Sequence, residues 1–219
     1  MSFTQYLRIQ ANDLWSKEQS HPFIQEIGSG KLPLEKFQYF MKQDYIFLIE
    51  YCRVISLCVA KTEKISDMNF FSSLLHETLD IEMDLHISFC KDFDISKQDL
   101  EKTFPSNATE SYTNHLLKVA YSKSALDIAV SILPCAWGYS EIGQKLKSNG
   151  LPLNAPLYSK WIELYSSVEF EELAIQIKKY IDLESQNISD QYKKNLENIF
   201  ISSSNHEYNF WDSAYKLSP

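Results

Sequence analysis

Apolar side chains recur three and four positions apart along almost the whole chain, and no alternating strand pattern appears. This spacing predicts amphipathic helices, separated by breaks where glycine and proline gather. The predicted helices run from about Phe3 to Ser20 (resuming after the HPF break up to Gly28), Pro33 to Lys61, Asp67 to Phe93, Ser111 to Ser122, Ala125 to Ser148, Leu157 to Ser166, Phe170 to Leu183 and Ser189 to Ala214. The pattern predicts an all-α fold, a single bundle of about eight helices in one domain over residues 1–219.

Polar side chains interrupt three of the apolar faces. Asp44 falls between Phe40 and Leu48 on the face of one long helix, and Glu207 lies inside the stripe of the last helix. Cys135 shares a face with apolar residues one turn away. A single inward acid is most often a satisfied structural group, and a buried cysteine usually packs as a small hydrophobe. Two carboxylates and a thiol directed inward from different helices favour a functional pocket instead.

A proline adjoins the thiol. In the stretch ILPCAWGYSEIG, Pro134 stands inside a predicted helix, immediately before Cys135. Proline removes a helical hydrogen bond and costs about 3 kcal/mol in a helix interior. We therefore expect a bend that frees a backbone carbonyl and opens space beside Cys135.

A metal site is the alternative for the third polar helix. Glu82 and His86 are spaced i, i+4 and share the face of Leu79. Such a pair is able to bind one ion, although a mutual hydrogen bond is its more common use. Di-iron bundles need two Glu-x-x-His pairs, and the only such spacing here is Glu18 to His21, directly before a proline. The pattern therefore disfavours a metal site, and it disfavours a haem held by His21 even more.

Composition narrows the class of protein further. The 219 residues are 44% apolar, enough for a full core, and the formal charge of -8 disfavours nucleic-acid binding. Four cysteines without a CxxC pair favour reduced thiols in the cytoplasm. The N-terminus has no apolar signal core, and the longest apolar stretch contains Asp127 and Pro134, so neither secretion nor a membrane span is expected.

Several longer segments together are similar to a known family. HPFIQEIGSGKLPLEKFQYFMKQD, LPCAWGYSEIG, YSKWIELY and SSNHEYNFWDSAY resemble the TenA family, also called thiaminase II, from about Tyr6 to Tyr215. The resemblance implies a haem-oxygenase-like all-α fold without haem, metal or other cofactor, and a homotetramer. It also implies hydrolysis of 4-amino-5-aminomethyl-2-methylpyrimidine to the hydroxymethyl pyrimidine in thiamine salvage, with thiamine as a possible second substrate.

The resemblance assigns a role to individual residues. It implies that Cys135 is the nucleophile, that Glu207 in HEYNFW is the acid and base, and that Asp44 in KQDYIF binds the pyrimidine. The presence of Cys135 matches the cysteine-containing branch of the family. Where many members carry a tyrosine that poises the thiol, this chain has Phe47. The family's pocket tyrosines match Tyr112, Tyr139 and Tyr165.

Two other functions stay open at this point. A non-catalytic pyrimidine-binding or regulatory bundle would keep the aromatic pocket without turnover. A haem-oxygenase-like metalloenzyme would use Glu82 and His86 as ligands. A turnover assay separates the first from an enzyme, and elemental analysis tests the second.

Overall fold

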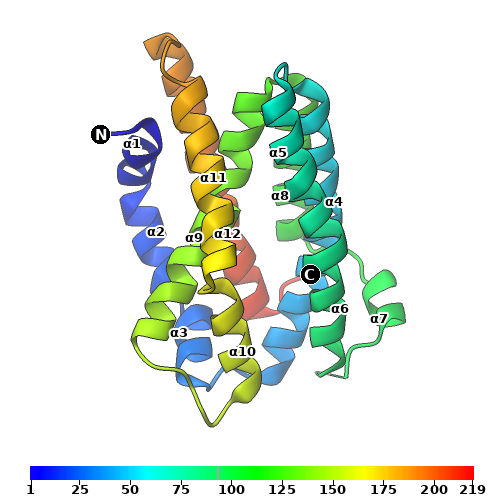
Figure 1. Ribbon diagram of the computed structural model, residues 1–219. Helices are drawn as coiled ribbons and strands as arrows, with labels where there is room; N and C mark the ends of the chain where they lie inside the picture. Colours follow the sequence, from blue (N-terminus) through cyan, green and yellow to red (C-terminus); the bar gives the residue numbers. More distant parts are fainter. Residues whose placement is uncertain (93) are drawn as a thin grey trace. The chain divides into compact units, whose positions relative to one another are not determined.

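The computed structural model describes residues 1–92 and 94–219, and the side chains of all of these except 81, 82, 84 and 85. The described residues are mostly helical and contain no strand (Figure 1). In chain order the elements are α1 (Phe3–Gln10), α2 (Asn12–Gln19), α3 (Pro22–Ser29), α4 (Leu34–Lys61), α5 (Ile65–His76), the π-helix η1 (Glu77–Glu82), α6 (Met83–Lys91), α7 (Lys97–Glu101), α8 (Asn107–Ser122), α9 (Ala125–Ser148), α10 (Pro156–Tyr165), α11 (Val168–Glu184) and α12 (Asp190–Lys216). The predicted all-α class is therefore confirmed.

The described residues form more helices than the predicted eight or so, for local reasons. The first predicted helix divides at Ala11, where φ is -95° and ψ is 7°. The predicted loop after the third long helix contains α7, which begins with a capping box: the Ser96 hydroxyl accepts from the Asp99 N–H and the Asp99 carboxylate accepts from the Ser96 N–H. Ser106 caps α8, which therefore begins before the predicted Ser111.

The helix that carries Cys135 has the bounds that the sequence predicts. α9 runs from Ala125 to Ser148 and continues through Pro134. Because proline lacks an N–H, the carbonyl of Val130 receives no helical hydrogen bond from position 134. The bend expected there stays a prediction.

Contacts divide the chain into two compact units. Unit 1 contains Met1–Leu32 and Ala129–Asp212, and unit 2 contains Pro33–Ile128 and Ser213–Pro219. The expectation of one domain over residues 1–219 stays a prediction beside this division. Each unit is described below by itself.

Each unit has its own apolar core. The large, fully buried side chains of unit 1 are Leu7, Trp15, Phe23, Ile24, Ile27, Phe200 and Trp211. The corresponding side chains of unit 2 are Phe37, Phe40, Phe71 and Tyr112. Burial of such aromatic groups is the main favourable term that holds the helices of a unit together.

A helix that spans a membrane must be long and almost entirely apolar. Across the part of the chain that the structure describes, no helix is both long and apolar enough to cross a bilayer.

Candidate active site

Unit 1 contains the predicted nucleophile and the predicted acid. Cys135 and Tyr139 lie one turn apart on α9, Tyr165 ends α10, and Glu207 lies on α12. The Glu207 side chain is buried, with 2% of its surface exposed. The stripe on the last helix therefore predicted its inward direction correctly.

The four cysteines differ in burial. Cys135 is half-buried, whereas Cys52, Cys58 and Cys90 are buried. Desolvation raises the pKa of the Cys58 thiol far above its ordinary value, against a smaller lowering by Lys61. Desolvation, with the nearby Asp44 carboxylate, raises the pKa of the Cys90 thiol to about 12. Thiolate is the reactive form, so these two thiols are poorly suited to nucleophilic chemistry.

Aromatic rings pack around Tyr139 in unit 1. Its ring centroid lies 4.9 Å from those of Tyr165 and Trp211 and 6.1 Å from that of Trp161. Trp161 and Tyr165 are 4.7 Å apart. We call Tyr139, Trp161, Tyr165 and Trp211 the aromatic wall. Two of the predicted pocket tyrosines, Tyr139 and Tyr165, are thus brought together.

A glycine on α9 permits this packing. A Cβ atom on Gly143 would lie 2.5 Å from the carbonyl carbon of Tyr165. Any side chain at position 143 would therefore clash with backbone at the end of α10. Glycine lets α9 pass close to Tyr165, and one turn earlier the Tyr139 ring reaches the Tyr165 ring.

Unit 2 contains the remaining predicted site residues. Asp44 and Phe47 lie on α4 and Tyr112 lies on α8, and all three are buried. The rings of Phe47 and Tyr112 are in contact, with centroids 4.8 Å apart. The structure thus joins the predicted substrate-binding residues of this unit across two helices.

Gln43, next to Asp44, fixes the position of α4 against the start of α8. Its amide oxygen accepts from the Ser106 N–H at 2.9 Å and from the Thr109 hydroxyl at 2.6 Å. Its amide nitrogen donates to the Phe104 carbonyl at 3.1 Å. A buried amide held by three bonds leaves little freedom to the backbone beside Asp44.

His86 on α6 faces Asp44. Its Nε2 lies 2.8 Å from the Met41 carbonyl oxygen, which only accepts, so Nε2 carries the proton. Desolvation lowers the pKa of His86 to about 4, against a smaller rise from the Met41 bond, so the ring is neutral at pH 7. Nδ1 then presents a lone pair to Asp44 Oδ2 at 3.4 Å. Two facing acceptors repel each other, so this contact is favourable when a proton lies between them.

Both ring nitrogens of His86, the proposed metal ligand of the alternative function, face other groups of the protein. Its ring nitrogens face Met41 and Asp44. The side chain of Glu82 lies outside those that the structure describes. Among the described side chains, no group of three or more His, Cys, Asp and Glu residues is placed to hold a metal ion. The use of Glu82 and His86 as ligands therefore stays a prediction.

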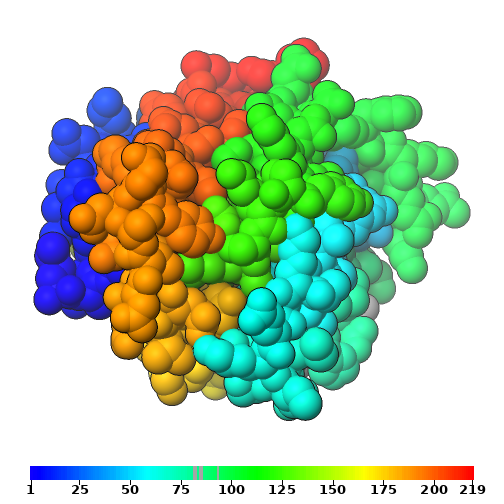
Figure 2. Space-filling view, turned by 90° about the horizontal axis from the view of Figure 1, so that it is seen from above, coloured from blue at the N-terminus to red at the C-terminus, as the bar shows by residue number. Residues whose placement is uncertain are grey.

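A pocket of about 690 Å³ lies elsewhere in unit 1, between α1, the end of α11 and the start of α12. Figure 2 shows these N-terminal residues, in blue, beside the orange segment that ends α11 and begins α12. Asp182 accepts from the N–H and hydroxyl of Thr4 at 2.8 and 3.0 Å, and Glu197 accepts from Tyr6 at 2.8 Å and Lys194 at 2.6 Å. These groups pair with each other, and none of the predicted site residues lines this pocket.

The sequence did not reveal several residues around the candidate site. Trp211 lies one turn after Glu207 in HEYNFW, a spacing that places both on one helix face. Trp161 lies in YSKWIELY, one turn before Tyr165. Glu18 stood out only for its spacing to His21, whereas its carboxylate in fact accepts from the Trp211 indole at 2.9 Å.

Solved structures share the fold of this chain. A TenA homologue from P. horikoshii matches with a TM-score of 0.91 and 28% identity, covering 99% of each chain. A domain from Shewanella denitrificans, described as having a heme oxygenase-like fold, matches with a TM-score of 0.76 over 98% of this chain and 92% of that one; its 15% identity shows the fold alone. The chain is thus an all-α protein of the haem-oxygenase-like fold class.

Sequence comparison narrows the class to a family. The model of the TENA/THI-4/PQQC family matches residues 8–217. A relative from Halalkalibacterium halodurans named aminopyrimidine aminohydrolase is 44% identical over 215 residues, which cover 98% of this chain and 96% of that protein. The chain belongs to the TENA/THI-4/PQQC family.

Proposed function

We propose that the chain is an aminopyrimidine aminohydrolase (thiaminase II) that acts by covalent catalysis at Cys135. It hydrolyses 4-amino-5-aminomethyl-2-methylpyrimidine to the 5-hydroxymethyl compound and ammonia, and cleaves thiamine as a second substrate. The 44% identical relative of that name supports the substrate class. The observation that carries the chemistry is the half-buried Cys135 thiol, since the other three cysteines are buried.

The first step is addition of the thiolate to the ring. The Cys135 sulfur forms a bond to the ring carbon next to the one that bears the aminomethyl group, and aromaticity is lost. The electron pair moves to a ring nitrogen, which takes a proton from Asp44. Asp44 suits this step because its carboxyl is buried and its Oδ2 lies 3.4 Å from Nδ1 of the neutral His86 ring.

The second step exchanges the amine for water. The ring expels the amine, which leaves as ammonia after Glu207 gives it a proton, and an exocyclic methylene remains. Water then adds to the methylene, and the Glu207 carboxylate takes the proton of the water. The thiolate leaves, the ring nitrogen returns its proton, and the aromatic ring is restored. Burial of Glu207 suits a group that acts as acid and then as base.

The aromatic residues hold the flat ring. Tyr139 and Tyr165 of the aromatic wall, and Tyr112 with Phe47, offer faces for stacking, and the tyrosines offer hydroxyls to the ring edge. No nucleic-acid partner is part of the proposal. A homotetramer and a cytoplasmic location follow from the resemblance and the reduced cysteines, and size-exclusion chromatography with light scattering tests the first.

The test is steady-state kinetics of wild type and Cys135→Ala on the aminopyrimidine and on thiamine. We expect turnover of the aminopyrimidine by wild type, none by Cys135→Ala, and retained binding of the hydroxymethyl pyrimidine by that variant. Cys52→Ala and Cys58→Ala are matched controls that should keep full turnover, because those thiols are buried. Turnover in Cys135→Ala would remove the nucleophile. Saturable binding without turnover by wild type would favour a non-catalytic pyrimidine-binding protein.

A further inference from the structure

Two buried polar side chains of α2 face α12. The Trp15 indole donates to the Ser204 hydroxyl at 2.9 Å, and Glu18 accepts from the Trp211 indole at 2.9 Å. Trp15 and Glu18 are 1% and 2% exposed, and Ser204 and Trp211 are fully buried. Buried bonds of this kind are costly to break on one side, so they hold the two helices in one register.

These two bonds lie on either side of Glu207. Ser204 precedes Glu207 by three residues and Trp211 follows it by four. Residues spaced i, i+3 and i+7 share one face of a helix, so α2 contacts α12 on the face that carries Glu207. The same α2 contact therefore fixes the stretch of α12 directly above and below the predicted acid.

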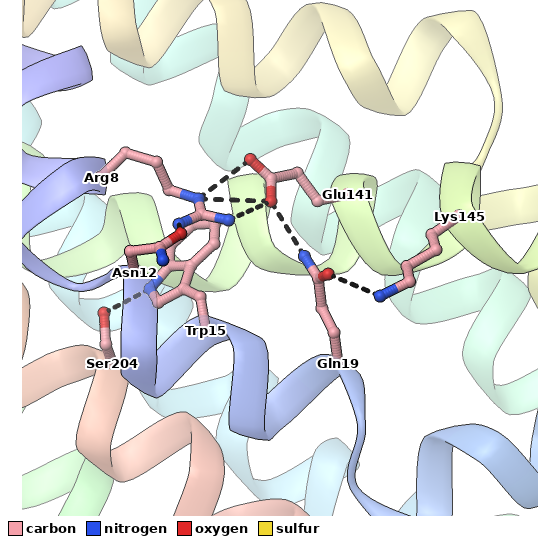
Figure 3. Close-up of polar contacts among 7 residues, drawn as sticks. All are labelled: Arg8, Asn12, Trp15, Gln19, Glu141, Lys145 and Ser204. Atoms are coloured by element: carbon pink, nitrogen blue, oxygen red, sulfur yellow. Dashed lines mark hydrogen bonds and ion pairs between the residues drawn. The ribbon is translucent and has the colours of Figure 1, made fainter.

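The N-terminal helices α1 and α2 also contact α9 (Figure 3). Glu141 accepts from the Arg8 guanidinium at 2.9 Å and from the Gln19 amide at 3.0 Å. The Trp15 ring meets Trp137 edge to face, with centroids 5.4 Å apart. Trp137 lies two residues after Cys135, so the N-terminal helices are tied to the helix of the nucleophile as well.

Glu18 contacts the aromatic wall at Trp211. The Trp211 ring that it holds lies 4.9 Å from the Tyr139 ring. On the α9 side, Gly138 lies beside the Glu18 carboxylate: a Cβ there would be 3.8 Å from its oxygen, an ordinary van der Waals contact. An indole N–H only donates, and the Glu18 carboxyl offers it an acceptor whether or not it is ionised.

We propose that Glu18 is a positioning residue for the reaction: by holding the Trp211 indole, it fixes the aromatic wall and the stretch of α12 that presents Glu207. This inference rests on the proposed function. Glu18 touches neither substrate nor reacting atoms in this role and acts only through Trp211. Its chemical requirement is an acceptor oxygen at this position, and a charge is not required.

The requirement separates two substitutions at one site. Glu18→Gln keeps an acceptor oxygen for the Trp211 indole. Glu18→Leu has a side chain of similar size but leaves the Trp211 N–H without an acceptor. Small misplacements of catalytic groups cost up to about 100-fold in rate. We expect Glu18→Leu to lower kcat about 10- to 100-fold with a smaller change in KM, and Glu18→Gln to stay within about threefold of wild type.

Glu197→Leu is the matched control. Glu197 lies on the same helix as Glu207, ten residues before it, and is 3% exposed. Its hydrogen bonds are to Tyr6 and Lys194, away from the aromatic wall. Its loss should lower stability and leave kcat within about twofold, because ten residues of helix span about 15 Å. An equal fall of kcat in Glu197→Leu and Glu18→Leu would show that instability alone lowers the rate, and would overturn the proposal. So would an equal fall in Glu18→Gln and Glu18→Leu, or unchanged kcat in folded Glu18→Leu.

A spectroscopic readout keeps the test open if Glu18→Leu fails to fold. The indole N–H resonance of Trp211 is assigned by its absence in Trp211→Phe. Desolvation raises the pKa of Glu18 to about 7, against a lowering by the Trp211 bond, with smaller effects of Glu141 and Arg8. The resonance should therefore shift with a midpoint near this pH in wild type and lose the shift in Glu18→Gln. A resonance that ignores Glu18→Gln would overturn the contact on which the proposal rests.

Failure of the proposed function has a different signature. In that case wild type would not turn over the aminopyrimidine and Glu207→Gln would have no rate to lose, while the Trp211 resonance would still follow Glu18. If instead wild type and Glu207→Gln behave as proposed and Glu18→Leu does not, only the positioning role fails.

Discussion

Each of the two units buries a carboxyl group against the nitrogen of an aromatic ring, and the two nitrogens differ. In unit 1, Glu18 faces the indole of Trp211 at 2.9 Å. In unit 2, Asp44 faces the imidazole of His86 at 3.4 Å. Indole nitrogen always donates, whereas a neutral imidazole presents one donor and one acceptor. Because Met41 takes the donor of His86, the nitrogen toward Asp44 is the acceptor.

This difference decides what each carboxyl is suited to do. The Glu18 contact holds in both protonation states, so it gives a fixed geometry. The Asp44 contact is favourable only with a proton between the partners, so it couples geometry to proton position. The first arrangement fits a positioning residue, and the second fits a group that moves a proton to and from a pyrimidine.

Glu18 and His86 also give opposite pH dependence of stability. The pKa of Glu18 is raised from an ordinary 4.5 to about 7, so the folded state keeps a proton that the unfolded state loses, and stability falls as pH rises through this window. The pKa of His86 is lowered from 6.5 to about 4, so the unfolded state gains a proton first, and stability falls as pH drops through that window.

The largest difference between the two units is expected when each carboxyl is changed to an amide, Asp44→Asn in unit 2 and Glu18→Gln in unit 1, and turnover is measured. Asp44→Asn removes the proton that the pyrimidine nitrogen takes, and we expect kcat to fall about 10²- to 10⁴-fold. Glu18→Gln retains the acceptor for Trp211 and should remain within about threefold. Steady-state kinetics on the aminopyrimidine at pH 7 measure both.

Equal losses in the two amide variants would erase the distinction between positioning and proton transfer. Binding of the hydroxymethyl pyrimidine by Asp44→Asn provides the control. If binding is lost together with turnover, the role of Asp44 is to hold the ring, and its proton is not needed.

The inward faces of these helices were predictable from the sequence. Apolar spacing placed Asp44 and Glu207 inside, and their side chains are 5% and 2% exposed. The bounds of α9 also followed from the pattern. Such features depend on residues within one or two turns, which periodicity records directly.

The partners of the buried groups were not predictable. Glu18 and Trp211 are 193 positions apart, and periodicity states only that each side chain faces inward. The spacing of Glu82 and His86 on one predicted helix did not reveal that His86 faces Met41 and Asp44 on α4. The break at Ala11 has neither glycine nor proline to mark it, so the sequence pattern did not reveal it.

Glu18→Gln should also change the pH dependence of stability. At pH 8 we expect the variant to be more stable than wild type by up to about 3 kcal/mol, because a carboxylate no longer ionises in the core. Urea unfolding at pH 5 and 8, followed by tryptophan fluorescence, measures this. All four tryptophans, Trp15, Trp137, Trp161 and Trp211, belong to unit 1.

Glu197→Gln gives the opposite sign in the same assay. Desolvation alone would raise the pKa of Glu197, but hydrogen bonds from Lys194 and Tyr6 outweigh it and the pKa is lowered. Its carboxylate therefore stabilises the fold above the ordinary pKa, and the amide should destabilise at pH 8. Parallel pH profiles for wild type and Glu18→Gln would contradict the raised pKa.

His86→Asn should change the dependence of stability on pH below pH 6.5. Wild type should lose up to about 3 kcal/mol from His86 between pH 6.5 and 4, partly offset by Glu18, and the variant should lack this loss. Shortening the side chain weakens the bond to Met41, so the variant is less stable at pH 7. Far-UV circular dichroism is the measurement, because unit 2 contains no tryptophan. Unchanged acid sensitivity in the variant would mean that other groups titrate there.

The smallest effect is expected from Phe47→Tyr in unit 2. The Phe47 ring contacts Tyr51 and Tyr112, with centroids 5.7 and 4.8 Å away, and a tyrosine ring in the same orientation would keep both contacts. The family resemblance implies that a tyrosine here favours the thiolate of the nucleophile. A hydrogen bond to a charged group contributes about 1.5–3 kcal/mol, so alkylation of Cys135 should shift by about one to two pH units to lower pH, and kcat should rise severalfold. The pH dependence of the iodoacetamide reaction in both forms measures the shift. Superimposed curves, together with lower stability of Phe47→Tyr, would mean that the new hydroxyl has no partner and that residue 47 only packs against Tyr112.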